Sequence, residues 1–441
     1  MDPTANEPER DACERDLAEP APASRAGAVS REPTPSSHVE LARRSQRAPS
    51  RRPLVVGAFQ AGTRANGGLS SLTEIVKRLE RYRPIVVTDR ESNHTERWRG
   101  LGLEVHVWPA PLPDEQTPRA LRWTERMGSM LEHGRRASAL LGASGARVVH
   151  CNDFWALCHL APAARRAGRK VLLDVRSTQG VRGVRWRTAR ALSDRVVALS
   201  AEMKAYLERE LSPLPFGKPA PIEHVYSIVD TEALGPPESA ERKRARAALG
   251  IPDGEMAIGV VGVVSERKRQ LELLELLARS PAALPPNARL YLIGDFEPKR
   301  DEYARRCQGL IERQGLGRSV RAVGYRDDMP TWYRALDCVV LASRYEGLAR
   351  AMIEAQAAGL PVVSFPVCSA REILEAGRSG LVVPEGDFAG LFAACRTLAK
   401  DPALRAELAD NAWRSARERF AAARTVSAYE ALYAALEAEA S

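Results

Sequence analysis

The chain has 441 residues, of which 44% are apolar and 27% are charged. This length and mixture are typical of a soluble globular protein with two or three domains, and they exclude collagen-like, coiled-coil and wholly disordered chains. No run of about 18 uncharged apolar residues occurs, so we expect no membrane-spanning helix. The charged N-terminus, MDPTANEPERDACERD, lacks the apolar core of a secretory signal.

The cysteines and histidines restrict the compartment and the kind of site. There are seven cysteines and no C-x-x-C pair, a usage that favours a reducing, cytoplasmic location over a disulfide framework or a zinc ribbon. All seven histidines lie at or before His224, and no H-E-x-x-H motif is present. A histidine-based metal site in the second half of the chain is therefore excluded.

The net charge of +9 is concentrated in one part of the chain. Residues 1–52 hold 9 basic and 9 acidic residues, residues 231–441 hold 29 of each, and residues 53–230 hold 27 basic and 18 acidic. This asymmetry indicates a domain that faces an anionic partner, or a general preference for arginine. The densest part, RGVRWRTARALSDR at residues 182–195, fits either an anionic membrane surface or a solvated helix face. No motif that binds nucleic acid accompanies it, so we expect no such partner.

Composition and the pattern of apolar residues divide the sequence into four parts. Residues 1–52 are rich in Pro, Ala, Ser, Glu and Arg, so we expect them to be disordered. Short β-branched runs alternating with helical segments then predict two parallel α/β domains, over 53–230 and 231–420, with a ligand cleft between them. Residues 421–441 carry apolar residues at helical spacing and predict a final helix. The expected strands are 54–59, 84–89, 103–108, 147–153, 170–175, 195–200, 221–230, 256–264, 289–295, 320–325, 338–343, 360–365 and 380–385.

The most informative stretch is SRYEGLARAMIEAQAAGLPVV at residues 343–363. A helix is expected to begin near Leu348, with Glu346 just before it and Glu354 on it. The spacing of eight turns the two carboxylates to similar sides, about two turns apart. Taken alone, the pair also fits a capping glutamate followed by a solvated one. The unpaired N–H donors at this helix start, which suit an anion or a sugar hydroxyl, belong to Gly347, Leu348 and Ala349.

Two further loops have a composition that suits phosphate. The basic loop Arg267-Lys268-Arg269 follows the strand GVVGVV and precedes a helix, an arrangement that binds phosphate without a Walker lysine motif. In the first domain, Gly67-Gly68 would let a ligand approach the backbone closely. Each segment also fits an ordinary solvated loop. No G-x-x-x-x-G-K-[ST] and no G-x-G-x-x-G occurs, so P-loop and dinucleotide readings lose support.

Together these segments resemble the retaining nucleotide-sugar glycosyltransferases of family 4, also called group 1 glycosyltransferases. The resemblance covers roughly residues 53–441 and is most specific in YRALDCVVLASRYEGLARAMIEAQAAGLPVVSF and SAREILEAGRSGLVVPEGD, with support from LIGD and VGYRDDMPTWY. It implies the α/β GT-B fold, in which two Rossmann-like parallel-sheet domains face each other across a cleft. It also implies that the final helices, residues 421–441, pack back on the first domain.

The resemblance implies transfer of a sugar from a nucleotide-diphosphate sugar to a hydroxyl acceptor, with retention and without a metal or cofactor. The acceptor would be a cell envelope polysaccharide, a glycolipid or a small molecule, and the enzyme would be cytoplasmic, with peripheral contact to the inner face of the membrane through residues 182–195. Glu346, Lys268 and Arg267 would carry the chemistry, the two cations on the diphosphate and Glu346 on the donor sugar. The other implied donor contacts are Gly347, Leu348, Ala349, Glu354, Gly67, Gly68, Tyr325 and Arg326.

Two positions depart from the family's pattern. Val263 stands where an arginine usually follows Gly262, so Arg267 or Arg269 would have to supply the charge. In the first domain, a histidine that many members carry is missing. The residues left as possible first-domain contacts are His150, Asp153, Asp174 and Arg176.

These departures keep other functions open. One is a catalytically silent protein that binds sugar nucleotides or acts as a scaffold. Another is a GT-B sugar-nucleotide epimerase, although the histidine-free second domain does not favour its acid–base chemistry. A phosphorylase would need a pyridoxal lysine, and no such motif stands out.

Overall fold

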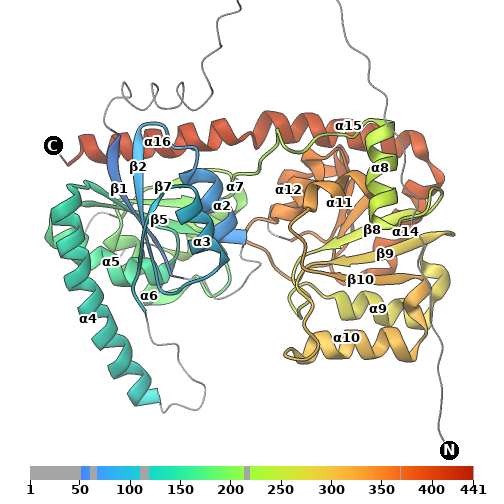
Figure 1. Ribbon diagram of the computed structural model, residues 1–441, viewed down its shortest axis with the longest axis horizontal. Coiled ribbons are helices and arrows are strands. Elements are labelled where there is room, and N and C mark those ends of the chain that lie inside the picture. Colours follow the sequence, from blue (N-terminus) through green and yellow to red (C-terminus); the bar gives the residue numbers. More distant parts are fainter. Residues whose placement is uncertain (1–50, 60–66, 110–118, 213–218, 368, 441) are drawn as a thin grey trace, which may run out of the picture. The chain divides into compact units, whose positions relative to one another are not determined.

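The computed structural model describes residues 51–59, 67–109, 119–212, 219–367 and 369–440, with the backbone alone for 119–127 and 376. All of them belong to one compact unit, Arg51–Ser441. The predicted disorder of residues 1–52 falls outside the described residues, apart from Arg51 and Arg52. Within this unit the chain forms two separate parallel sheets, each covered by helices (Figure 1).

The first sheet has seven parallel strands in the order β3-β2-β1-β4-β5-β6-β7. The central strands are near-continuous apolar runs because helices cover both faces. Leu54 through Ala58 are all buried in the strand Arg52–Ala58, whereas the edge strand Glu104–Val107 is half-buried or exposed throughout. The last strand is shorter than the expected 221–230, because the chain leaves the sheet after His224 and passes toward the second half. The strands are β1 (Arg52–Ala58), β2 (Tyr82–Thr88), β3 (Glu104–Val107), β4 (Val148–Cys151), β5 (Lys170–Val175), β6 (Arg195–Ala198) and β7 (Ile222–His224).

Among the described residues, six helices connect these strands, and several of them begin at a side-chain cap. Asp153 accepts a hydrogen bond from the Ala156 N–H at 2.8 Å, and Ser200 accepts one from the Met203 N–H at 3.0 Å. Such caps pair backbone donors that the first helical turn leaves free. The helices are α2 (Gly67–Val76), α3 (Asn93–Gly100), α4 (Arg119–Ser144), α5 (Phe154–Arg166), α6 (Gly183–Leu192) and α7 (Ala201–Glu210).

The second sheet has six parallel strands in the order β10-β9-β8-β11-β12-β13. Its strands are β8 (Met256–Val261), β9 (Ala288–Ile293), β10 (Val320–Gly324), β11 (Cys338–Leu341), β12 (Val362–Ser364) and β13 (Gly380–Val382). The α-helices of this half are α8 (Ser239–Leu249), α9 (Gln270–Arg279), α10 (Glu302–Arg313), α11 (Met329–Ala335), α12 (Arg350–Ala357), α13 (Ala370–Ile373), α14 (Phe388–Lys400) and α15 (Pro402–Arg419). Three 3-10 turns complete it, η1 (Pro281–Ala283), η2 (Leu316–Arg318) and η3 (Glu375–Gly377).

The last helix, α16 (Ala422–Ala438), packs on the first sheet's side of the molecule (Figure 1). Helix α15 just before it contacts α12, α14 and β13 of the second half, whereas α16 contacts α2 and β4. The apolar face of α16 closes the core above β1 and α2, where Leu54, Leu69 and Leu72 are fully buried. The members of that face are Ala422, Val426, Tyr429, Tyr433 and Leu436.

Candidate active site

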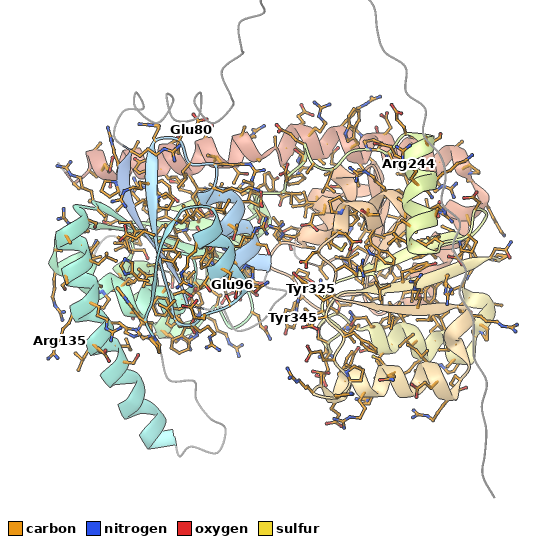
Figure 2. The ribbon with its side chains drawn as sticks, viewed as in Figure 1. Glu80, Glu96, Arg135, Arg244, Tyr325 and Tyr345 are labelled. Atoms are coloured by element: carbon orange, nitrogen blue, oxygen red, sulfur yellow. The ribbon has the colours of Figure 1, made fainter. Side chains whose placement is uncertain are left out.

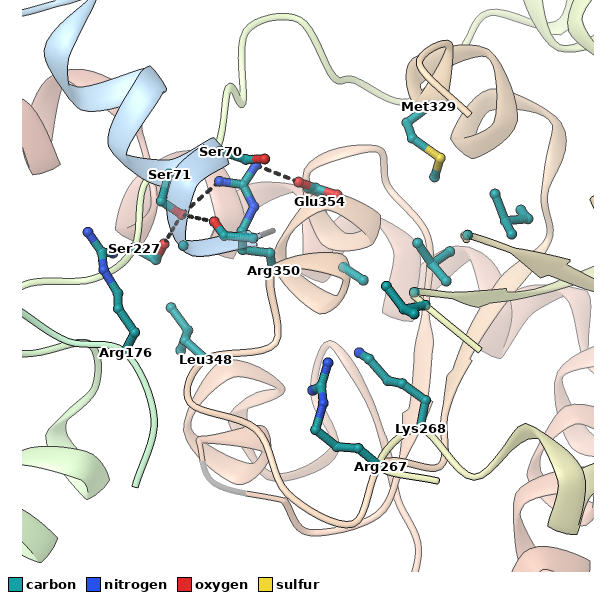
Figure 3. Close-up of a pocket in the computed structure, with 18 of the residues that line it drawn as sticks. Ser70, Ser71, Arg176, Ser227, Arg267, Lys268, Met329, Leu348, Arg350 and Glu354 are labelled. Carbon is teal, nitrogen blue, oxygen red and sulfur yellow. Dashed lines mark hydrogen bonds and ion pairs between the residues drawn. The ribbon is translucent and has the colours of Figure 1, made fainter. Parts of the chain in front are cut away.

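The carboxyl ends of both sheets border one cavity of about 320 Å³ (Figure 3). Ligands of open parallel α/β sheets bind at this edge, where loops and helix starts expose backbone donors. Helices α2 and α12 supply much of the remaining lining. The residues that directly follow strands β5, β6, β8 and β9 and line the cavity are Arg176, Leu199, Gly262 and Gly294.

Glu346, in the loop between β11 and α12, is held by three groups. Its Oε1 lies 2.7 Å from Lys268 Nζ and accepts a hydrogen bond from Ser343 Oγ at 2.8 Å, while Oε2 accepts one from Arg267 at 2.7 Å. Burial alone would raise the pKa of this carboxyl, but the two cations outweigh burial and hold the pKa below its usual value. The carboxylate is therefore ionised and fixed against the basic loop.

Gly262 lets Lys268 reach this position. A Cβ at Gly262 would lie 2.8 Å from Lys268 Cε, and the backbone φ of +136° also favours glycine. Arg269, the third basic residue, adopts φ +57° and pairs with Glu385 at 3.2 Å instead. Of the two arginines considered as substitutes for the one missing at Val263, only Arg267 lines the cavity.

Helix α12 begins at Arg350, two residues later than the expected start near Leu348. Ala349, its N-cap, has φ −74° and ψ 87°, which lies outside the helical region. The N–H groups of Gly347, Leu348 and Ala349 donate to no other residue in the described part of the chain. Leu348 lines the cavity of about 320 Å³, which we call the main cavity, and Gly347 lines a second cavity beside it. Ala349 lines neither.

Glu354 lies on α12 and lines the main cavity. Its Oε1 pairs with Arg350 at 2.8 Å, and its Oε2 accepts a hydrogen bond from the Tyr333 hydroxyl at 2.9 Å. Arg267 and Lys268 line the same cavity, so Glu354 and the basic loop share one space. A carboxylate has about four acceptor positions, so two partners leave room for ligand hydroxyls.

The two halves approach each other closely at Gly347. A Cβ placed on it would lie 1.8 Å from the Arg176 carbonyl oxygen and 3.1 Å from Ser177 Cα, both of the first half. Any larger residue would therefore collide with backbone of the other half. This contact requires glycine for space, because no atom of the neighbouring peptide can rotate away.

The remaining predicted donor contacts also line the main cavity. Gly67 and Gly68 open α2 on the first-domain side, and Tyr325 and Arg326 follow β10 on the other. Tyr325 is partly exposed and lies where the two halves face each other (Figure 2). Arg326 pairs with Asp328 at 2.8 Å.

The four possible first-domain contacts have different surroundings. Arg176 lines both cavities, and its guanidinium pairs with the fully buried Asp174 at 2.5 Å. His150 is also fully buried, between Tyr433 and Asp174, at 2.8 and 3.1 Å. Asp153 caps α5, and burial raises the pKa of its carboxyl to about 6. Arg176 is therefore the only one of the four that lines a described cavity.

A second cavity of about 270 Å³ adjoins the first and shares Gly68, Arg176 and Arg267 with it. Glu346 lines this cavity, so the two glutamates of the motif face neighbouring spaces. Sequence reasoning did not single out several of the lining residues. No spacing or motif marks them; they are Asn152, Ser177, Gln179 and Tyr345 here and Ser71, Ser227 and Arg350 in the main cavity.

Within the described ranges, no group of three or more His, Cys, Asp or Glu side chains is arranged to hold a metal ion. Among the described helices, none combines the length and apolar character needed to cross a bilayer.

Two family models match the chain in tandem. Residues 65–233 match the model described as Glycosyltransferase Family 4, and residues 241–415 match the one described as Glycosyl transferases group 1. The first match ends and the second begins between the two sheets. Each sheet thus carries its own family signature.

Curated relatives with similar sequences are named as sugar transferases of bacteria. The chain is 27% identical over 342 residues to a lipopolysaccharide core biosynthesis mannosyltransferase, LpcC, of Rhizobium leguminosarum bv. viciae, covering 76% of this chain and 89% of the relative. It is 27% identical to the mannosyltransferase LpsB of Rhizobium meliloti, covering 55% of this chain and 66% of the relative. A Streptomyces fradiae 2-deoxystreptamine N-acetyl-D-glucosaminyltransferase is 30% identical over a shorter span, 37% of this chain and 38% of the relative.

Solved structures share the fold. Anabaena HepE in complex with UDP superimposes with a TM-score of 0.72 at 21% identity, covering 87% of this chain and 100% of that one. WaaG, a glycosyltransferase involved in lipopolysaccharide biosynthesis, gives a TM-score of 0.62 at 16% identity, covering 85% and 98%. The predicted GT-B arrangement of two Rossmann-like parallel-sheet domains is therefore confirmed.

Proposed function

Since the chain belongs to the group 1 glycosyltransferases, with a family 4 first half, we propose that it moves a sugar from a nucleotide-diphosphate sugar to a hydroxyl acceptor, with retention at the anomeric carbon. The observation that carries this proposal is the double pairing of Glu346 with Lys268 and Arg267 beside the cavity that Glu354 lines. This pairing brings acceptors for sugar hydroxyls and donors for phosphate oxygens together.

In this proposal the diphosphate of the donor lies against the basic loop. Lys268 and Arg267 neutralise the charge that develops on the leaving phosphate when the bond to the sugar breaks. Fixed cations need no reorganisation at that moment, which is why they lower the barrier. The N–H groups of Gly347 and Leu348 add donors near the same oxygens or the sugar hydroxyls.

Glu346 and Glu354 divide the donor between them. Glu346 accepts hydrogen bonds from the sugar hydroxyls, and its low pKa keeps it an acceptor at neutral pH. Glu354 accepts from the ribose hydroxyls, and Tyr325 and Arg326 border the base. Gly68 allows the phosphates to approach the first domain closely, since it carries no side chain.

Retention follows from attack on the face that the phosphate leaves. The sugar C1–O bond to phosphate breaks, the acceptor oxygen bonds to C1 on the same face, and the acceptor's proton passes to the departing phosphate oxygen. No enzyme nucleophile, metal or cofactor takes part in this scheme. Lys268 and Arg267 stabilise the phosphate throughout.

The relatives support an acceptor in the cell envelope. Two of them are named as lipopolysaccharide core mannosyltransferases, so we propose a cell envelope polysaccharide or glycolipid as the acceptor of this enzyme. A cytoplasmic enzyme of this kind would meet its acceptor at the inner face of the membrane. Within residues 182–195, Arg182 and Arg185 are exposed and supply cations for that contact, whereas Arg190 donates to the Leu211 carbonyl and Arg195 pairs with Glu439.

A donor screen tests the proposal. The protein is incubated with UDP-, GDP- and ADP-sugars, with and without lipopolysaccharide-type acceptors, and nucleotide release is followed. Release that disappears in Glu346→Ala and Lys268→Ala supports transfer, and proton NMR of the product must show the donor's anomeric configuration. Binding without release across the acceptor panel would instead support a silent sugar-nucleotide-binding protein, and an inverted product would remove the retaining mechanism.

A further inference from the structure

We propose that Arg350 is a positioning residue that ties the two domains together and, through the same guanidinium, aligns Glu354 for the nucleotide. The proposal rests on the proposed function in one respect, namely that Glu354 binds the ribose of the donor. The tie between the domains stands on contacts alone. Arg350 belongs to α12, in the second half, and its guanidinium pairs with Glu354 of the same helix. Its other hydrogen-bond acceptors lie in the first half (Figure 3).

Three acceptors hold the Arg350 guanidinium. It donates to Ser71 Oγ of α2 at 2.8 Å and to the Ile228 carbonyl at 3.2 Å, and it pairs with Glu354 Oε1 at 2.8 Å. The side chain is only 19% exposed. Charge-assisted hydrogen bonds in a partly buried place are stronger and more directional than those at an exposed surface.

The first-half end of this contact is itself organised. Ser71 Oγ donates to the Gly67 carbonyl at 3.0 Å and lies 2.7 Å from Ser227 Oγ. A Cβ on Gly67 would lie 3.4 Å from Arg350 Cδ, so the stem of the arginine packs against the start of α2. Arg350 thus contacts a polar cluster of the first domain, which is formed by the start of α2 together with Ser227 and the Ile228 carbonyl.

The Glu354 end is equally fixed. Tyr333 donates to Oε2 at 2.9 Å, and burial raises the pKa of Tyr333 well above its usual value, so this phenol stays a donor. With Arg350 on Oε1, neither carboxylate oxygen can rotate freely. The acceptor positions that remain on the carboxylate therefore have a set direction toward the cavity that Glu354 lines.

These contacts couple the joining of the two domains to the binding of the nucleotide. If the domains separate at this edge, Arg350 loses Ser71 and the Ile228 carbonyl together, and only its helical pair with Glu354 remains. An i,i+4 ion pair alone is a weak restraint on side-chain direction. A nucleotide that needs Glu354 in its fixed direction therefore binds best when the domains are joined, and binding in turn favours the joined state.

Three variants separate the tie from the alignment. Arg350→Met removes both. Arg350→Lys keeps a cation for Glu354 but has one ammonium in place of a planar fork and a shorter reach. Ser71→Ala removes one of the two first-domain acceptors, leaves the Ile228 carbonyl, and keeps the pair with Glu354 intact. The matched control is Arg414→Met, because Arg414 is an exposed helical arginine in an i,i+4 pair with Asp410.

Each full-length variant is measured in two ways. Isothermal titration gives the Kd for UDP, GDP and ADP, and small-angle X-ray scattering gives the radius of gyration. For Arg350→Met we expect the preferred nucleotide to bind about tenfold more weakly, because the charge-assisted hydrogen bonds that orient Glu354 are lost. We also expect a larger radius of gyration. Arg350→Lys should lose less affinity, Ser71→Ala should enlarge the radius with a smaller loss, and Arg414→Met should match the wild type.

Kinetics supply a readout that a purely structural role would not move. Arg350→Met should raise the donor KM by the same factor as Kd, with kcat changed less than about threefold. A lower melting temperature with unchanged Kd, KM and radius would overturn the proposal, as would a change in only one of Kd and radius. If the wild type binds none of the three nucleotides, the proposed function fails, and a radius unchanged by Arg350→Met would then overturn the tie as well.

Discussion

Lys268 Nζ lies 2.7 Å from Glu346 Oε1, although the two residues belong to loops that follow different strands of the second sheet. Arg267 holds the other carboxylate oxygen at the same distance. One glutamate thus orients two cations toward the cavity, and the cations in turn keep the glutamate ionised. Loss of any member should affect the other two.

Lys268→Ala should lower kcat with a donor sugar by roughly 10²–10³, the loss expected for one fixed group that stabilises transition-state charge. Steady-state nucleotide release measures this. Lys299→Ala is the control, since Lys299 is exposed and outside both cavities. A Lys268→Ala enzyme with wild-type kcat would place the diphosphate elsewhere.

The low pKa of Glu346 predicts a pH-dependent stability. Burial opposes ionisation, yet Lys268 and Arg267 lower the pKa below that of the unfolded chain. The unfolded state therefore binds more protons between the two pKa values, and stability rises with pH there. The stabilisation is fully present above the unfolded value of about 4.3 and is lost as pH falls through the folded value.

Urea unfolding of wild type and Glu346→Gln across this acid range measures the effect. The difference in unfolding free energy should be constant near neutrality and should shrink on acidification, because protonation makes the wild type resemble the variant. A difference that grows as pH falls would mean that the folded-state pKa is raised instead.

Gly347→Ala should separate the domains or misplace the loop, since its Cβ would lie 1.8 Å from the Arg176 carbonyl oxygen. A displacement of about 1 Å can cost on the order of a hundredfold in rate, so we expect at least that loss of transfer activity. Gly317→Ala is a close control, because nothing lies within 4 Å of a Cβ built there. Equal activity of the two variants would contradict the tight contact.

Arg182 and Arg185 predict electrostatic membrane binding. Replacing both by glutamate should weaken binding to vesicles that contain anionic phosphatidylglycerol by at least about twentyfold, at about 1 kcal/mol per arginine near the surface. Wild-type binding should also fall steeply with salt. Vesicle sedimentation measures both, with Arg300→Glu as an exposed control. Binding that ignores salt would point to an apolar contact instead.

Local sequence predicted much of the site because its parts are local. The Glu346 and Glu354 spacing, the Lys268 loop and the alternating strands each lie within one continuous segment, so period and motif were enough. Arg269 shows the limit within such a segment. Its left-handed backbone turns it toward Glu385, and nothing in the letters RKR distinguishes it from its neighbours.

The rest depends on segments that meet only in three dimensions. Arg350 gains its first-half partners, and Gly347 its tight neighbour, only when one domain lies against the other. His150 lies within β4, near the carboxyl end of that strand, but Tyr433 of α16 and Asp174 enclose it. No spacing within one segment encodes such encounters, which is why His150 stayed among the possible first-domain contacts and Arg350 was not predicted.

The placement of α16 has a consequence for how the protein is made. Tyr429, Tyr433 and Leu436 complete a core whose other members, such as Leu54 and Leu72, are synthesised first. The first domain is synthesised before α16, so its apolar surface stays uncovered until α16 has been translated. Its maturation is therefore bound to translation of the other half, and nascent chains stalled before α16 should depend on chaperones.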